Sequence, residues 1–290
     1  MKKIKIAIAS GKGGTGKTFV STNLFFSLQQ KNNLVTLVDC DAEEPNDLMF
    51  IEGIHQKTTD ITQLVPIIDK DKCTLCGKCY EYCNYNAIFF LPNEKIINVL
   101  EDLCHGCGAC SVACEFDAIT EKVESLGKVN QYKITEKTSL IEARMKVGVH
   151  SAVPVIKGAI KAADSDIVLL DSPPGTSCPF IQTVALSDFV VLVTEPTPFG
   201  LSDLKQSVET LKSLKKPCAV IINRDGLGND EVADYLKDEN IPLLMKIPFD
   251  KNIATCYSKG EILSRNDPEW EIKFNELYNK IIEVYGNSCN

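Results

Sequence analysis

The chain has 290 residues, a formal net charge of −8 and 44% hydrophobic side chains, so it is long enough to bury a full core. Its acidic excess argues against a general nucleic-acid binder, because such proteins usually carry a basic excess or a basic stripe. The apolar run near the N-terminus is too short for a secretory signal, and no stretch approaches the roughly 20 apolar residues of a membrane span. We therefore expect a cytoplasmic protein with no nucleic-acid partner and no stable membrane insertion.

Strand and helix patterns alternate along most of the chain. Residues 4–10 form a short β-branched run, and residues 17–30 repeat apolar side chains at helical spacing. Further apolar runs are continuous, as in strands covered on both faces; they span residues 34–39, 167–171, 189–194, 219–223 and 243–247. Helical patterns between several of them, at 201–216 and 230–240, predict an α/β fold with a parallel sheet between helices.

Two further segments carry weaker patterns. Residues 123–148 are expected to contain an outer strand around residues 131–135 and a short helix. Residues 269–286 form an amphipathic helix that is acidic rather than basic, so anionic lipid would repel it. We expect this last helix to dock onto its own domain.

The alternation stops between residues 64 and 122, where the sequence is rich in cysteine and repeats itself at an offset of 31 residues. DKCTLCGKCYEYCNYNAI (71–88) aligns with DLCHGCGACSVACEFDAI (102–119), with eight of eighteen positions identical, including every cysteine. We interpret residues 64–122 as a small α+β domain inserted in a surface connection. The α/β domain is then discontinuous and consists of residues 1–63 and 123–290.

A glycine-rich loop between the first strand and the first helix matches a phosphate-binding motif. Its sequence GKGGTGKT (11–18) fits G-x-x-x-x-G-K-[ST]. Backbone N–H groups of such a loop and the following helix N-terminus bind anions; the candidates are Gly11, Gly13, Gly14, Thr15 and Gly16. Lys17 is expected to contact the β- and γ-phosphates, and Thr18 to supply a hydroxyl oxygen to Mg²⁺. The loop therefore predicts binding of ATP with Mg²⁺.

An early lysine in this loop, Lys12, carries a resemblance to a known family. The run KGGTGKT (12–18) resembles the deviant Walker A ATPases, which include MinD, ParA, Mrp-type carriers and the nitrogenase iron protein. The resemblance implies an ATP-dependent face-to-face dimer, formed with itself or with a similar ATPase. It also implies that Lys12 reaches across the dimer to the nucleotide bound by the partner.

The same resemblance implies roles for three polar residues at strand ends. In LVDCD (37–41), Asp41 would orient the attacking water and touch the Mg²⁺ shell. In IVLLDSPPG (167–175), Asp171 would lie near Mg²⁺, and Asn223 would bond the base. Catalysis would then combine positioning with charge stabilisation by the expected catalytic groups Lys12, Lys17 and Asp41.

Eight of the thirteen cysteines form two runs of the type C-x₂-C-x₂-C-x₃-C. Bacterial two-cluster ferredoxins have this spacing, and the fourth cysteine of each run ligates the other cluster. We therefore expect two [4Fe–4S] clusters; one would use Cys73, Cys76, Cys79 and Cys114, and the other Cys104, Cys107, Cys110 and Cys83. Two structural zinc sites are the alternative, although zinc hooks are usually separated by a spacer.

Two functions from different classes follow from these motifs. The first is an ATPase in which nucleotide-dependent dimer switching is coupled to electron transfer, as the whole chain resembles MinD-type ATPases with an inserted ferredoxin domain. The second is an iron–sulfur assembly or carrier ATPase of the Mrp type, with transfer through Cys178. Either function implies a redox or iron–sulfur client protein as partner.

Overall fold

The structure is a computed structural model that describes residues 3–288 and divides into two compact units. The first unit contains the segments up to Thr59, Val129–Arg144 and from Val153 onward. The second contains Asp60–Lys128 and Met145–Ala152, so it extends beyond the predicted range 64–122 on both sides. Each unit is described by itself below.

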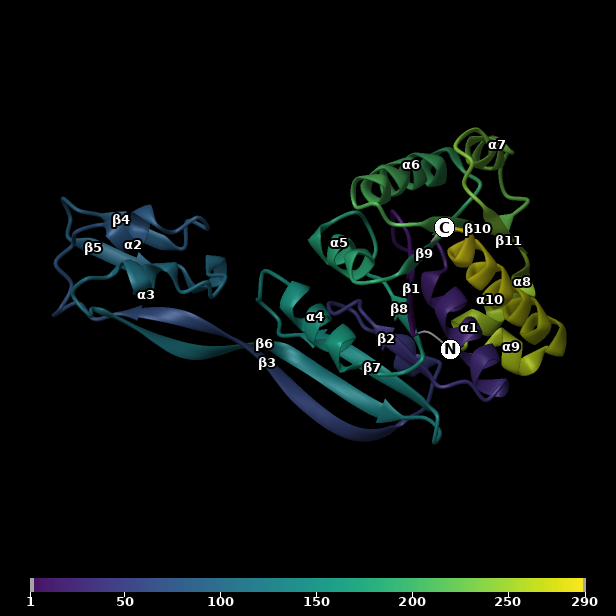
Figure 1. Ribbon diagram of the computed structural model, residues 1–290, viewed down its shortest axis with the longest axis horizontal. Coiled ribbons are helices and arrows are strands. Elements are labelled where there is room, and N and C mark those ends of the chain that lie inside the picture. The colour runs from purple at the N-terminus through teal and green to yellow at the C-terminus, as the bar shows by residue number, and fades with distance from the viewer. Residues whose placement is uncertain (1–2, 289–290) are drawn as a thin grey trace. The chain divides into compact units, whose positions relative to one another are not determined.

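Within residues 3–288, nine strands form one sheet in the order β11-β10-β9-β1-β8-β2-β7-β6-β3 (Figure 1). Their bounds are β1 Ile4–Ala9, β2 Val35–Asp39, β3 Ile54–Ile68, β6 Ile119–Lys133, β7 Thr138–Met145, β8 Ile167–Asp171, β9 Phe189–Thr194, β10 Cys218–Asp225 and β11 Leu243–Pro248. All neighbouring pairs from β11 through β7 are parallel. The predicted parallel α/β sheet is confirmed.

Helices cover both faces of this sheet in the first unit. Figure 1 shows α1, α9 and α10 on one face and α4, α5 and α6 on the other. The bounds are α1 Lys17–Gln30, α4 Val153–Ala162, α5 Cys178–Ala185, α6 Pro198–Ser213, α7 Glu231–Asp238, α8 Lys251–Ser258, α9 Leu263–Asn266 and α10 Pro268–Ser288, with a 3-10 turn at Asp47–Met49. No helix within residues 3–288 is both long and apolar enough to cross a membrane.

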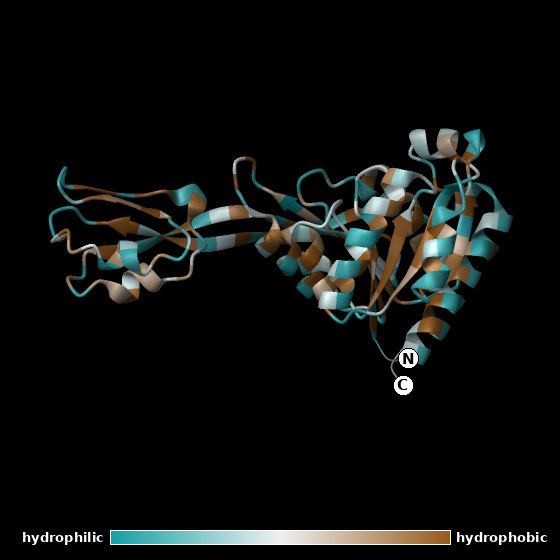
Figure 2. Cartoon of the chain, turned by 90° about the horizontal axis from the view of Figure 1, so that it is seen from above, coloured by the Kyte–Doolittle hydropathy of each residue, from teal (hydrophilic) through white to brown (hydrophobic). Residues whose placement is uncertain are grey.

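The core explains why these strands are apolar without a break. Ile6 and Ile8 face the core formed with α1 and α10, whereas Ala7, which alternates with them, is equally buried on the other face. Figure 2 shows the central strands as hydrophobic and the outer sides of the helices as largely hydrophilic. Phe274 of α10 is fully buried and packs edge-on against Phe19 of α1, with ring centroids 6.0 Å apart. The expected docking of the last helix onto its own domain is confirmed.

The second unit is built from the repeat. It contains two short helices, a two-stranded antiparallel sheet and a 3-10 turn; these are α2 Lys78–Glu81, α3 Ala109–Ala113, β4 Ile88–Leu91, β5 Ile96–Val99 and Glu101–Leu103. Asp69 N donates to Ala118 O, and Leu100 N donates to Ala87 O, both at 2.8 Å. These two bonds are exchanged by the 31-residue offset, so the repeat halves form a pseudo-symmetric pair.

Several elements differ from the prediction in a physically informative way. The strand expected around residues 131–135 is the end of β6, and residues 123–148 contain no helix, so the short helix expected there was wrong. β3 was not predicted because most of its residues from Ile54 to Leu64 are exposed or only half-buried, which removes the apolar period. α4 was not predicted, and its interior contains Gly158, a poor helix former.

Candidate nucleotide and cysteine sites

The parallel strands bring the predicted polar residues to one edge of the sheet. In register, Asp171 of β8 lies opposite Ile8 of β1 on one side and opposite Asp39 of β2 on the other. The glycine loop starts directly after β1, and Asn223 lies near the end of β10. This edge is where open α/β sheets bind ligands.

The loop geometry requires glycine at two positions. Gly14 and Gly16 have φ values of 75° and 99°, in the left-handed region that strains other residues. A Cβ at Gly16 would lie 2.3 Å from Asn223 Nδ2, so the side chain of Asn223 lies directly against the loop. A Cβ at Gly11 would lie 2.5 Å from Asp203 O, whereas at Gly13 it would only touch Pro174 at 3.9 Å. The loop is thus closely supported by the elements around it.

Lys17 and Thr18 start α1 beside the buried end of β8. Lys17 is only 8% exposed; burial lowers the pKa of its ammonium group, and the charges of Asp171 and Asp41 oppose this shift. Thr18 Oγ1 donates to Asp171 Oδ2 at 2.7 Å, and Ser21 Oγ donates to Asp171 Oδ1 at 3.1 Å. Lys17, Thr18, Asp41 and Asp171 are therefore brought together.

One polar atom in the loop is left without a partner among the described residues. The hydroxyl of Thr15 is buried, with the residue 2% exposed, and makes no hydrogen bond there. A buried hydroxyl costs free energy unless it is hydrogen-bonded, so a polar ligand in the loop would satisfy it. This orphaned group fits a phosphate ligand.

The two aspartates after β2 have different surroundings. Asp39 is 1% exposed and accepts hydrogen bonds from the backbone N–H groups of Asp41, Asn46 and Asp47 at 2.8 to 3.1 Å. It thereby fixes the turn that carries Asp41. Asp41 is only partly buried; burial raises the pKa of its carboxyl group, and a backbone hydrogen bond from Glu44 and the charge of Lys17 lower it.

Sequence reasoning missed a further carboxylate, Asp47. It is fully buried, and neither of its carboxylate oxygens has a hydrogen-bond partner within the described part of the chain. Burial raises its pKa well above the usual value, as do the charges of Asp39 and Asp171. Burial also raises the pKa of Asp171 to about 6, against hydrogen bonds from Thr18 and Ser21. The only sequence signal for Asp47 was that it is an acidic residue soon after a buried strand.

The structure gives Lys12 and Asn223 partners within the chain. Lys12 Nζ lies 3.1 Å from a carboxylate oxygen of Glu195, which directly follows β9 and was not predicted. Asn223 Nδ2 donates to Thr15 O at 2.7 Å, and Asn223 Oδ1 accepts from the N–H of Arg224 at 2.9 Å. Both ends of the Asn223 amide are therefore engaged with protein, although each retains capacity for one more hydrogen bond.

The eight cysteines of the repeat line two separate hollows of the second unit. Cys83, Cys104, Cys107 and Cys110 line one hollow. Cys73, Cys76, Cys79 and Cys114 line the other. In each hollow, three cysteines come from one run and the fourth from the other run. No group of three or more histidine, cysteine, aspartate or glutamate side chains in residues 3–288 is arranged to hold a single metal ion.

Glycines with left-handed backbone and backbone N–H groups lie close to the cysteines of these hollows. Gly77 and Gly108 directly precede α2 and α3 with φ values of 80° and 74°. The N–H groups of Ala87 and Gly106 donate to the sulfurs of Cys83 and Cys104 at 3.3 and 3.4 Å. Such bonds stabilise cluster-bound thiolates.

Three of these thiols, Cys79, Cys104 and Cys110, have a raised pKa and so hold their protons more strongly than a free cysteine. Burial is the largest cause, and it raises the pKa of Cys79 to about 11. It also raises the pKa of Cys104 and Cys110 above the usual value. Because only thiolates ligate metals, a cation in either hollow would have to displace these protons.

The hollows differ at two positions related by the repeat. Tyr85 and His105 line one hollow and stack with ring centroids 4.0 Å apart. Phe116 and Thr74 line the other at the equivalent positions. The surroundings of the two cysteine sets are therefore chemically different.

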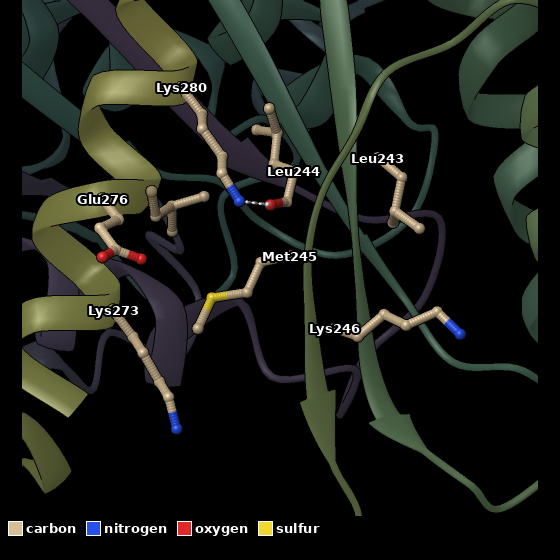
Figure 3. A pocket seen from close by; sticks show the side chains of 8 residues that line it. Leu243, Leu244, Met245, Lys246, Lys273, Glu276 and Lys280 are labelled. Carbon is tan, nitrogen blue, oxygen red and sulfur yellow. Dashed lines mark hydrogen bonds between the residues drawn. The ribbon is translucent and has the colours of Figure 1, made fainter. Parts of the chain in front are cut away.

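Two other features do not belong to these groups. Cys178 is exposed and is the first residue of α5. A pocket of about 410 Å³ lies between β11 and α10 (Figure 3). Its lysines have partners: Lys280 Nζ donates to Leu244 O at 3.1 Å, and Lys273 pairs with Glu269 at 2.7 Å. This pocket does not include the phosphate loop.

Comparisons with known proteins agree with this geometry. An uncharacterized protein of Methanocaldococcus jannaschii is 33% identical over 287 residues, covering 96% of this chain and 95% of that protein. An iron–sulfur cluster carrier protein of Aquifex aeolicus is 24% identical over 283 residues, covering 92% of this chain and 63% of the carrier. The Pyrococcus horikoshii septum site-determining protein MinD, solved with Mg-ADP, superposes with a TM-score of 0.60 at 21% identity and 99% coverage of both chains.

The family model that matches this chain extends from the first strand to α9. It describes the CobQ/CobB/MinD/ParA nucleotide binding domain and matches residues 6–263, which include the glycine loop, Asp41, Asp171 and Asn223. The match therefore covers most of the chain and every element that forms the nucleotide edge of the sheet. The chain belongs to the CobQ/CobB/MinD/ParA nucleotide-binding family.

Proposed function

We propose that this protein binds and hydrolyses ATP with Mg²⁺ and couples its nucleotide state to electron transfer through two [4Fe–4S] clusters. The observation that carries the proposal is the crossed arrangement of the eight cysteines, four to each hollow. It agrees with two-cluster ferredoxin ligation, in which each run gives its fourth cysteine to the other cluster. Under this proposal residues 64–122 act as a ferredoxin-like insertion.

The nucleotide part is supported by the phosphate loop and its surroundings. Thr15 has an orphaned hydroxyl in the loop, and Lys17 lies at the start of α1 close to two carboxylates. Mg-ADP is bound by the structurally similar Pyrococcus MinD. We assign phosphate contact to Lys17, Mg²⁺ ligation to Thr18, Mg²⁺ support to Asp171, and orientation of the attacking water to Asp41.

The cluster part is supported by the chemistry of the donor set. Soft thiolates are the ligands that iron–sulfur clusters take, and N–H groups directed at Cys83 and Cys104 favour the ligated state. The clusters would supply one-electron transfer. The eight cysteines would hold them, and the other residues lining the hollows would form their surroundings.

The partners follow from the same proposal. The loop lysine Lys12 and the family membership support a dimer with itself or with a similar ATPase. A redox protein would accept or deliver electrons at the second unit. Asn223, whose amide already bonds the loop, would contact the base with its remaining hydrogen-bond capacity.

An iron–sulfur carrier function is the second candidate. It is favoured by relatives named iron–sulfur cluster carrier protein, among them the Aquifex aeolicus protein and one from Methanococcus maripaludis. Cys178 is exposed and would serve as the transfer thiol. Cys178→Ala separates the candidates, because it should abolish donation to an apo-protein only if the carrier function is correct.

Anaerobic purification followed by iron counting and EPR spectroscopy of the reduced protein tests the main proposal. About eight iron atoms per chain are expected from two four-iron clusters. Addition of Mg-ATP should alter the cluster spectrum or reduction potential. Colourless protein that contains zinc or no metal would contradict the cluster proposal, and clusters indifferent to Mg-ATP would contradict the coupling.

A further inference from the structure

The phosphate loop is tied at two points to the end of β10. Asn223 bonds the carbonyl oxygen of Thr15, and the next residue, Arg224, donates to Glu195 Oε1 at 2.5 Å. Glu195 Oε2 lies 3.1 Å from Lys12 Nζ. Because Lys12 and Thr15 belong to one loop, and Asn223 and Arg224 are adjacent in the chain, these contacts close a polar ring that includes part of the loop.

Glu195 connects the two cations of this ring, Lys12 and Arg224. Its side chain is 8% exposed, so its charge requires a cationic partner, and it has two. Arg224 makes the shorter contact, and its guanidinium stays charged at any relevant pH. Lys12 makes the longer contact from a flexible stem. Lys12 can therefore leave without stranding a buried unpaired carboxylate.

We propose that Glu195 is a positioning residue that holds the ammonium group of Lys12 against β9 until a nucleotide phosphate competes for it. Arg224 keeps the carboxylate paired when Lys12 leaves. The inference rests on the proposed nucleotide site, and it assigns to that site a competition between one carboxylate and the phosphates for one lysine. Binding of nucleotide then includes the cost of breaking the Lys12–Glu195 pair.

This arrangement predicts opposite effects for two substitutions. Glu195→Gln removes the competitor, so Mg-ATP should bind about fivefold more tightly, as expected for one partly exposed ion pair. Arg224→Gln leaves Glu195 with Lys12 as its only cation in the ring, so Mg-ATP should bind about fivefold more weakly. Arg224→Lys keeps a cation beside Glu195 and should restore most of the wild-type affinity.

A double-mutant cycle attributes the effect to Lys12. In a Lys12→Gln background, Glu195→Gln should no longer tighten binding, because there is no ammonium group to release. If Glu195 only supported the fold of the loop, the same substitution would weaken binding with and without Lys12. The direction of the change therefore distinguishes positioning from a structural role.

The experiment is titration of the full-length protein and its variants with a fluorescent ATP analogue and Mg²⁺, with thermal melting to verify folding. Glu239→Gln is the matched control, since Glu239 pairs with Lys212 at the far end of α6 and should leave affinity unchanged. Should Glu195→Gln fail to fold, the Arg224 variants carry the test.

The outcomes separate this inference from the proposed function. Tighter binding by Glu195→Gln, lost in the Lys12→Gln background, supports the inference, as does weaker binding by Arg224→Gln that Arg224→Lys restores. Wild-type binding with affinity unchanged or lowered in Glu195→Gln, or unchanged in Arg224→Gln, overturns the inference alone. No binding of Mg-ATP by the wild-type protein overturns the proposed function together with the inference.

Discussion

The glycine loop contains neighbouring positions that look alike in sequence but differ in what surrounds them. Gly16 combines a left-handed backbone with the amide nitrogen of Asn223 directly beside its Cα. Gly13 has neither constraint, because a Cβ added there would contact only Pro174. The two glycines therefore offer a matched pair of substitutions.

Gly16→Ala should destabilise the protein and weaken nucleotide binding. The left-handed backbone alone costs a non-glycine residue about 1–3 kcal/mol, and the new methyl group must also displace Asn223 from Thr15. Chemical denaturation and titration with the fluorescent ATP analogue measure the two effects. Gly13→Ala is the control and should change the stability little; equal losses for both variants would contradict this account.

Asp171 should make stability depend on pH in the absence of Mg²⁺ and nucleotide. The pKa of the Asp171 carboxyl group is about 6 in the folded protein and near 3.8 in the unfolded chain. The stability contribution is therefore present below pH 3.8 and is lost as pH rises through 6, by at most about 3 kcal/mol. Urea denaturation between pH 4 and 7 measures this slope.

Asp171→Asn should reduce that slope, because an amide does not titrate in this range. Asp164→Asn is the control, since Asp164 pairs with Lys3 and the pKa of its carboxyl is lowered rather than raised. A slope that remains unchanged in Asp171→Asn would show that the other buried carboxylates, Asp39 and Asp47, account for it.

At the scale of residues, the sequence indicated the groups that belong to a contiguous motif. The loop from Gly11 to Thr18 could be recognised because its spacing reflects one turn and one helix start. Glu195 could not, because its partner Lys12 lies on another strand connection and only the sheet order brings them together. Asp47 was missed because burial, not spacing, makes it unusual.

At the scale of elements, α10 supports the helix that begins at the phosphate loop. Phe274→Ala should lower the free energy of unfolding by about 3–5 kcal/mol, because it leaves a cavity against Phe19 in a fully buried position. Ile272→Ala, on the exposed side of the same helix, should have little effect. Guanidinium denaturation of both variants measures the difference, and similar losses would argue against this packing.

The lining of the two cysteine hollows leads to a second prediction at this scale, which concerns the cysteines that would share a cluster. Cys114→Ala should alter the EPR signal of the same cluster as Cys76→Ala, although Cys114 belongs to the other run. Cys83→Ala should instead match Cys107→Ala. If each fourth-cysteine variant matched its own run, the clusters would be ligated without crossing.

Helices and strands were predictable from the sequence wherever their burial produces a pattern of apolar residues. The central strands are buried on both faces, so continuous apolar runs located β1, β2, β8, β9 and β10. β3 carries few buried residues, so hydrophobicity gave no indication of it. α5 begins with Cys178 and Pro179 after a serine, and it is too short for its period to stand out.

At the scale of the whole molecule, the proposed coupling between nucleotide and clusters would act in both directions. If Mg-ATP shifts the reduction potential of a cluster, reduction of that cluster must change ATP affinity by the same factor. A typical coupling of about 1–3 kcal/mol corresponds to about 5–150-fold in affinity. Anaerobic titration of oxidised and dithionite-reduced protein measures it, and Lys17→Ala provides a control without a phosphate contact.

The exchange of fourth cysteines between the repeat halves has a consequence for how this segment could have changed over time. If each half supplies one thiolate to the cluster of the other half, as proposed, loss of either half would disrupt both clusters. Two copies that were redundant after a duplication would then have come to depend on each other. A descendant with one cluster would first need a new ligand for the cluster that it keeps.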